Sequence, residues 1–398
     1  MSTSIGVLMS LILPIAAVSP LWLAPLTVIF GGPILLFLFY KRTFIDYRQN
    51  NLKFGVSILA LLWLWAITSL LWTINVQGAL LEIVRTGCLF AFLPIVIWGS
   101  QVPQNLREGI INAFLIGFLV GLGLIVIQIF LGATFINLWQ HSFLAMPRGV
   151  FALNRTAAVL AIFVWPALII LWERSKHRLC LAIALIAIAL LWVLSNETAL
   201  LSYAIGLLVA AIAVVVPKMI KPLLGVILAG GVLVAPFLPQ TILMPDKWLS
   251  ISCIQANPSF LHRLYIWQFA SQKIEERPLL GWGFNSARAL PEGHEIIHIN
   301  PPCTENITSG EKLPLHTHNA VLQIWLELGA VGAIILAAFL AWASYRIQQI
   351  DRMGSAIGYG HFITTLMIAS MSFGAWQSWW LCTILLSVLL MTFARARP

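Results

Sequence analysis

Residues 315–332 read Leu-His-Thr-His-Asn-Ala-Val-Leu-Gln-Ile-Trp-Leu-Glu-Leu-Gly-Ala-Val-Gly and join the longest polar segment of the chain to a long apolar one. The apolar run continues to about Trp342, which is long enough for a helix that crosses a bilayer. Two histidines, His316 and His318, and Asn319 stand at its beginning. Because imidazole titrates near neutral pH, this stretch predicts acid–base chemistry at a boundary between water and membrane.

Composition assigns the chain to the membrane class. Of its 398 residues, 60% are hydrophobic and only 9% are charged, whereas a soluble chain of this length needs more charge to cover its surface. The net charge of +9 does not indicate nucleic acid as a partner, because most basic residues fall in short loops. The sequence has no glycine-rich phosphate loop, and its histidines lack the spacing of metal ligands, so we expect neither a cofactor nor a metal.

Apolar runs predict about twelve membrane-spanning helices, each near the ~20 residues that a bilayer needs. They are expected at residues 5–18, 20–39, 54–73, 79–98, 110–131, 156–172, 179–195, 198–216, 222–238, 319–345, 355–371 and 376–393. The first run lacks a basic region and a cleavage site, so we interpret it as a retained helix. The sequence therefore predicts an all-α polytopic membrane protein with a single domain over residues 1–398.

The distribution of lysine and arginine predicts the orientation. Basic residues are concentrated in alternate loops, such as 41–53 and 174–178, and in the C-terminal tail. The positive-inside rule makes these segments, and both termini, cytoplasmic. A long loop, residues 239–318, then lies on the outer side and still carries several arginines.

This outer loop is expected to contain an amphipathic helix. Asn257-Pro258-Ser259 predicts its beginning and Pro278 its end. A glycine turn follows at 281–283, and we expect residues 291–314 to form an irregular lid. Cys253 and Cys303 are the only cysteines of the loop, and an oxidising outer compartment predicts a disulfide between them.

Three motifs, in this order, resemble the O-antigen ligase/polymerase superfamily. They are His-Arg-Leu-Tyr-Ile-Trp at 262–267, Arg-Pro-Leu-Leu-Gly-Trp-Gly at 277–283, and His-Asn followed by Leu-Glu-Leu-Gly at 318–329. The resemblance covers roughly residues 140–345. It implies a fold similar to that of metal-independent membrane glycosyltransferases, and a site on the periplasmic face of the bacterial inner membrane.

The resemblance also implies the substrates. Family members take a glycan from undecaprenyl diphosphate; ligases join it to lipid A–core, and polymerases join it to another repeat unit. We favour the ligase, with the polymerase as an alternative. A transporter would also place arginines and histidines beside a membrane cavity, but we find neither the inverted repeats nor the paired broken helices that are typical of transporters.

Glycan transfer from a lipid diphosphate needs a base for the acceptor hydroxyl and cations for the leaving group. The resemblance assigns the base to His318; spacing alone is equally consistent with a histidine that caps the next helix. We expect His316 to orient the loop, and Asn319 to hold neighbouring backbone or a substrate hydroxyl.

Arginines are the expected diphosphate ligands, because a guanidinium binds phosphate through two parallel hydrogen bonds. Arg263 carries the family match, and its alternative is an ion pair with Glu275 or Glu276. Arg288 follows the glycine turn and either reaches the same site or is a solvated loop residue.

One departure from the family pattern concerns the helix near residue 198. Many ligases carry Ser-Arg there, and that arginine contacts the diphosphate, but this chain has Ser195-Asn196-Glu197. Arg155, at the start of an earlier helix, either replaces the missing cation or pairs with Glu197. A cation at a helix N-terminus opposes the helix dipole, so an anionic partner is expected.

Three further residues have two interpretations each. Trp267 and Trp282 either stack on sugar rings or anchor the loop at the interface. Arg85 lies within an apolar run, where charge is costly, and we favour a structural pair with Glu82.

Overall fold

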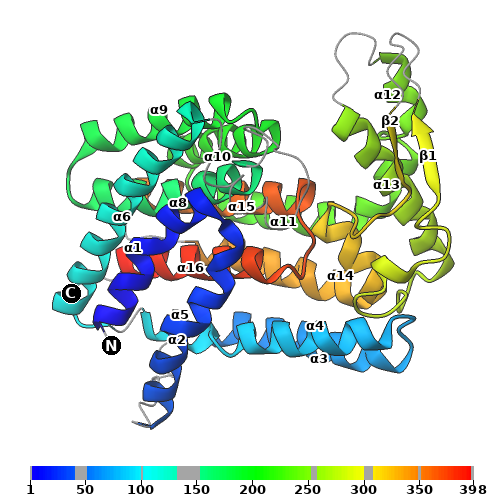
Figure 1. The fold of residues 1–398 in the computed structure, drawn as a ribbon, viewed down its shortest axis with the longest axis horizontal. Coiled ribbons are helices and arrows are strands. Elements are labelled where there is room, and N and C mark those ends of the chain that lie inside the picture. Colours follow the sequence, from blue (N-terminus) through cyan, green and yellow to red (C-terminus); the bar gives the residue numbers. More distant parts are fainter. Residues whose placement is uncertain are drawn as a thin grey trace.

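The computed structural model describes residues 2–40, 52–99, 102–131, 153–251, 258–299, 308–347 and 351–395, and these are mostly helical (Figure 1). The first part contains α1 (Ser2–Val18), η1 (Pro20–Trp22), α2 (Leu23–Tyr40), α3 (Leu52–Thr68), η3 (Ser69–Leu71), α4 (Val76–Phe90), α5 (Leu93–Gly99) and α6 (Gln104–Phe130). The middle contains α8 (Asn154–Glu173), α9 (His177–Val193), α10 (Glu197–Val215), α11 (Ile220–Val234), η5 (Ala235–Gln240), α12 (Pro245–Ile251) and α13 (Pro258–Glu276). The last part contains η7 (Ala287–Ala289), β1 (Ile296–Ile299), β2 (Thr308–Glu311), α14 (Ala320–Arg346), α15 (Arg352–Met371) and α16 (Ser378–Arg395).

All twelve predicted apolar runs are helical in the structure. Among the described residues, seven helical stretches are long and apolar enough to cross a membrane, and four apolar helices are shorter. The all-α polytopic membrane class is therefore confirmed. Twelve crossings, a single domain and the outer location of residues 239–318 stay predictions.

Helix α8 is the centre of the bundle. Its residues from Thr156 to Leu171 are all buried, and α1, α9, α10, α15 and α16 pack around it. A helix that is apolar on every side is stable only when neighbours surround it. Beside it, α1 packs closely along α6, where Gly117 and Gly121 face the backbone of α1 and leave no room for a side chain.

Helices α12 and α13 and the two strands form a lobe at one end of the bundle (Figure 1). Helix α13 begins at Pro258 and ends at Glu276, one residue before each end of the helix that the sequence predicts, Ser259 to Arg277. The irregular lid predicted for residues 291–314 is wrong in part, because β1 and β2 pair there as an antiparallel hairpin with Ile296 opposite Glu311. β-branched residues favour strand structure here, and the Nε2 atom of His262 in α13 lies 2.8 Å from the carbonyl oxygen of Glu311.

Helix α14 is interrupted at Gly329, which differs from the uninterrupted helix that the sequence predicts. Gly329 has φ 65° and ψ −164°, outside the helical region. The N–H groups of Trp282 and Gly283 donate to the carbonyls of Leu326 and Glu327 at 2.8 and 2.9 Å. The Arg-Pro-Leu-Leu-Gly-Trp-Gly segment thus replaces helical hydrogen bonds at the interruption.

The predicted disulfide is not tested by the structure. Cys253 and Cys303 lie outside the described residues, so their disulfide stays a prediction. Cys88, Cys180 and Cys382 lie in apolar helices and are free thiols.

Candidate functional site

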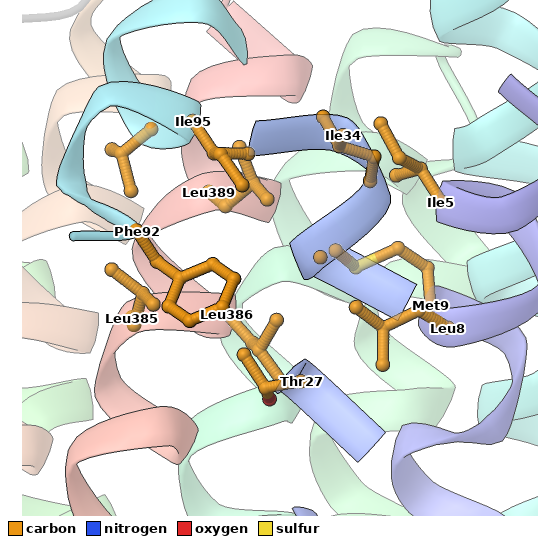
Figure 2. Close-up of a pocket in the computed structure, with 12 residues that line it drawn as sticks. Ile5, Leu8, Met9, Thr27, Ile34, Phe92, Ile95, Leu385, Leu386 and Leu389 are labelled. Atoms are coloured by element: carbon orange, nitrogen blue, oxygen red, sulfur yellow. The ribbon is translucent and has the colours of Figure 1, made fainter. Parts of the chain in front are cut away.

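Two cavities differ sharply in chemistry. Figure 2 shows the smaller cavity, which is enclosed mainly by apolar side chains of α1, α2, α5 and α16. Thr27 also lines it, but its hydroxyl donates to the carbonyl of Leu23 at 2.7 Å. The larger, of about 310 Å³, is polar and is in the size range of small-molecule sites. It is lined by Leu21, Ala24, Glu82, Arg85, Arg155, Asn285, Arg288, Leu315, His316, Gln323, Gly374, Trp376, Gln377, Ser378 and Trp379. We call it the arginine cavity.

Positive charge dominates the arginine cavity. Arg85, Arg155 and Arg288 line it, and Glu82 is the single carboxylate among the described lining residues. Two helices also begin there, α8 next to Arg155 and α16 at Ser378. Helix N-termini present free N–H groups and a positive dipole end, so the cavity suits an anion such as a diphosphate.

Each arginine of the cavity comes from a different element. The Arg85 guanidinium lies 3.4 Å from the Glu82 carboxylate, which confirms the predicted pair, yet both side chains also face the cavity. Arg155 lies over the ring of Trp379, with its central carbon 5.9 Å from the centroid. Arg288 lies in the short helix η7 that follows the glycine turn. The predicted ligands Arg155 and Arg288 are therefore brought to one cavity.

The two histidines lie side by side with their rings tilted by 56° to each other. The rings of His316 and His318 lie 4.2 Å apart between centroids, and His316 lines the arginine cavity whereas His318 does not. The Nδ1 atom of His318 lies 2.8 Å from the carbonyl oxygen of Ser372, so Nδ1 carries the proton and donates it. Among the described residues, the Nε2 atom of His318 has no hydrogen-bond partner, and a neutral ring presents a lone pair there.

His316 is engaged at both ring nitrogens. Its Nδ1 accepts from the backbone N–H of His318 at 3.1 Å, and its Nε2 lies 3.1 Å from the side-chain nitrogen of Gln377. These contacts hold the ring in place and leave it less suited than His318 to accept a proton.

Burial keeps both histidines neutral. It lowers the pKa of His316 to about 3, with further lowering by the charges of His318, Arg288 and Arg263. It lowers the pKa of His318 to about 4, although the bond to Ser372 raises that pKa and Arg263 lowers it. The neutral form, which a general base requires, is thus the stable form at neutral pH.

Arg263 lies apart from the cavity. Its guanidinium donates to the Thr198 hydroxyl at 3.3 Å, so the alternative of a pair with Glu275 or Glu276 is wrong. Burial lowers the pKa of Arg263, and the charge of Glu197 raises it. Glu197 at the start of α10 therefore acts on Arg263, while the charge of Arg263 also acts on both histidines.

Asn319 and the two predicted tryptophans support the backbone. The side-chain oxygen of Asn319 accepts from the N–H groups of Val321 and Leu322, so Asn319, not His318, caps α14. The indole of Trp267 donates to the carbonyl of Thr317 at 2.9 Å, inside the histidine loop. The indole of Trp282 donates to the backbone carbonyl of Lys273 at 2.8 Å. Sugar stacking by Trp267 and Trp282 stays a prediction.

Sequence reasoning missed the segment between α15 and α16. Trp376 and Gln377 of this segment, and Trp379 in the first turn of α16, line the arginine cavity, but the segment carries no charge and reads as a short break between apolar runs. It also missed Glu327 and Gln323 of α14. A carboxylate inside an apolar helix was an available signal, because such a residue is costly and often functional.

Comparisons with known proteins identify the family of the chain. A family model described as "O-Antigen ligase" matches residues 182–337. A protein of Rickettsia conorii named "Putative polysaccharide ligase" is 31% identical over 329 residues, which cover 80% of this chain and 74% of that protein. A Rickettsia bellii protein of the same name is 31% identical over 337 residues, covering 82% and 77%. No solved structure matches the chain. The chain belongs to the O-antigen ligase family.

Proposed function

We propose that this protein is a glycosyltransferase that moves a glycan from undecaprenyl diphosphate to lipid A–core on the periplasmic face of the bacterial inner membrane. The observation that supports this most is the arginine cavity beside a neutral histidine pair. The arginines can stabilise an anionic leaving group, and a neutral histidine can accept the proton of an acceptor hydroxyl.

The donor diphosphate occupies the arginine cavity in this proposal. Arg288 and Arg155 bind its oxygens, and Arg85 adds a third cation, the functional alternative to its structural pair with Glu82. Arg263 stabilises the reacting groups from the side of α13 and α10, where Thr198 fixes its guanidinium. Because arginines supply the positive charge, the proposed reaction includes no metal.

The base is His318. Its Nδ1–H is held by the carbonyl of Ser372, so Nε2 takes the proton of the acceptor hydroxyl. The acceptor oxygen attacks the anomeric carbon of the donor sugar, and the bond from that carbon to the phosphate oxygen breaks. Undecaprenyl diphosphate leaves with the negative charge, which the arginines stabilise, and direct attack inverts the anomeric centre. His316 positions the loop through its contact with the His318 backbone.

A polymerase would use the same donor and base, with another repeat unit as acceptor. A transporter fits less well. Its broken helices typically leave backbone groups free to bind ions or substrate. In α14 the N–H of Ala330, just past the interruption, donates to the carbonyl of Pro278 at 2.8 Å, and the indole of Trp65 donates to the carbonyl of Leu328 at 3.0 Å.

The experiment is a deletion strain whose lipopolysaccharide is separated on a gel. Ligase activity predicts long glycans that are absent from lipid A–core and retained on the lipid carrier, with recovery when the wild-type gene is restored. Single repeats on lipid A–core would indicate a polymerase instead. Unchanged lipopolysaccharide would contradict both.

A further inference from the structure

Glu327 is a buried carboxylate that the proposed reaction does not use. It lies in α14 two residues before Gly329, and its exposed fraction is 0%. An acidic side chain is rarely buried completely unless its surroundings satisfy it. Its partners therefore indicate what it does.

Within the described part of the chain, every hydrogen bond to the Glu327 carboxylate comes from an N–H donor. One oxygen accepts from the amide of Gln323 at 3.0 Å. The other accepts from the indole of Trp376 at 2.7 Å and from the backbone N–H of Asn285 at 2.8 Å. The backbone N–H of Ala287 is a further donor. A carboxylate suits this position because, when ionised, it only accepts.

The first group of donors belongs to the segment that carries Arg288. Asn285 lies three residues before Arg288, and Ala287 precedes it directly and begins the short helix η7 in which Arg288 lies. The α3–α4 connection holds the start of this segment, since the Ser69 hydroxyl accepts from the N–H of Phe284 at 2.9 Å and the Asn75 amide donates to the carbonyl of Asn285 at 2.9 Å. Glu327 holds the same segment from α14.

The second group belongs to the segment between α15 and α16, residues 372–377. Trp376 bonds Glu327 directly, and Gln323 links the two because its oxygen accepts from the N–H of Ala375 at 2.8 Å. The same segment supplies the Ser372 carbonyl that orients His318 and the Gln377 amide that contacts His316. The Glu327 side chain thus links the segment that carries Arg288 to the segment that contacts both histidines.

We propose that Glu327 is a positioning residue, which sets the placement of Arg288 relative to the histidine pair. This inference rests on the proposed function, because it assigns Arg288 to the donor diphosphate. Glutamine at this position would carry an N–H₂ group that must face one of the N–H donors. If that group faces Trp376 and Asn285, both segments lose their common acceptor. If it faces Gln323, that contact is lost and the two segments share only a neutral amide oxygen, which accepts more weakly than a carboxylate. In either case we expect the two segments to shift relative to each other.

The first test measures binding of undecaprenyl diphosphate to the purified protein in detergent. Glu327→Gln is expected to weaken binding by about tenfold, the typical effect of losing a hydrogen bond to a charged group. In an Arg288→Ala background the same change should cost less than about threefold, because a residue that acts through Arg288 has no effect without it. Equal losses in the two backgrounds, or wild-type binding by Glu327→Gln, would overturn the proposal.

The second test does not depend on the function. Hydrogen exchange of Glu327→Gln should rise in residues 284–290 and 372–377 and stay unchanged in α8. Thr364→Val is the matched control, because the Thr364 hydroxyl is equally buried and accepts from Trp165 at 3.0 Å, away from the cavity. It should leave both segments unchanged. Faster exchange spread over the whole bundle in Glu327→Gln would contradict a positioning role.

The two tests separate the two hypotheses. If the wild-type protein does not bind undecaprenyl diphosphate, the proposed function fails, and the exchange experiment still decides whether Glu327 joins the two segments. If Glu327→Gln does not fold, Glu327→Asp takes its place in both tests, because aspartate keeps the charge but holds the carboxylate one methylene closer to the backbone. Failure of both variants to fold, while Thr364→Val folds, would mean that Glu327 serves stability alone and would overturn the proposal.

Discussion

The ring centroids of His316 and His318 lie 4.2 Å apart with the rings tilted by 56°, yet only His316 lines the arginine cavity. His318 is fixed by the carbonyl of Ser372 and keeps its other ring nitrogen available. In the proposed reaction the two neighbouring residues have different tasks: His316 holds the loop, and His318 accepts the proton.

Arg263 should be sensitive to the shape of its side chain as well as to its charge. Lysine keeps the charge but loses the planar fork, so Arg263→Lys is expected to fold normally and to lose about 10²-fold in transfer rate. Arg174→Lys is the control, because Arg174 pairs with Glu108 in a partly exposed ion pair. Wild-type rates for both Arg263→Lys and Arg263→Ala would contradict the assignment.

The pH dependence of transfer should differ from that of an ordinary histidine. His318 acts as a base only when neutral, and burial lowers its pKa to about 4 from an ordinary 6.5. Activity is therefore expected to stay level from pH 8 down to about pH 5 and to fall toward pH 4. A loss centred near pH 6.5 in the pH–rate profile would show that the base is solvated.

The same depressed pKa values affect stability. The unfolded chain binds more protons than the folded one between the folded and unfolded pKa values of the histidines, so this contribution is complete above pH 6.5. It is lost as pH falls, to about pH 4 for His318 and to about pH 3 for His316. The midpoint of thermal unfolding should drop over this interval in the wild-type protein. The drop should be smaller in a variant with glutamine at both His316 and His318; an equal drop in that variant would assign it to other groups.

Gly329→Ala tests the interruption of α14. A side chain there would meet the carbonyl of Leu279, and φ is positive, so we expect a loss of roughly 1–3 kcal/mol in unfolding free energy and a larger loss of activity. Gly123→Ala is the matched control, since a side chain at Gly123 would meet no atom within 4 Å. Equal stability of the two variants would show that the interruption is not required.

How much of the fold can be predicted from the sequence depends on how far apart in the chain the interacting residues lie. Helix α13 was predictable, because the prolines at its two ends and the apolar spacing along it are local signals. The interruption at Gly329 was not, because backbone from residues 278–283 satisfies it from elsewhere in the chain. The hairpin was missed because its strands are short and stabilised partly by α13 through His262.

The candidate site divides in the same way. Histidines and arginines were found by residue type and motif, and Arg155, Arg288 and His316 do meet in one cavity. The place of Arg263 beside Thr198, and the contribution of Trp376, follow from packing between helices that are distant in sequence. Periodicity within a helix cannot reveal such contacts.

The predicted topology has its own test. Reporter fusions at Lys176 and at Glu292 should behave as cytoplasmic and periplasmic, respectively, because basic loops stay inside. Glu292 lies between η7 and β1 in the lobe of α12, α13 and the strands. A cytoplasmic signal at Glu292 would reverse the orientation and remove the periplasmic site.

The most direct measurement is transfer by the purified protein in proteoliposomes that contain an undecaprenyl-diphosphate-linked glycan and lipid A–core. Wild-type protein should transfer the glycan. His318→Ala should bind undecaprenyl diphosphate normally and lose roughly 10²–10⁴-fold in rate, the usual cost of a missing general base, whereas His316→Ala should lose less. Near-full transfer by His318→Ala with none by His316→Ala would assign the base to the wrong histidine, and no transfer by the wild-type protein would contradict the proposed reaction itself.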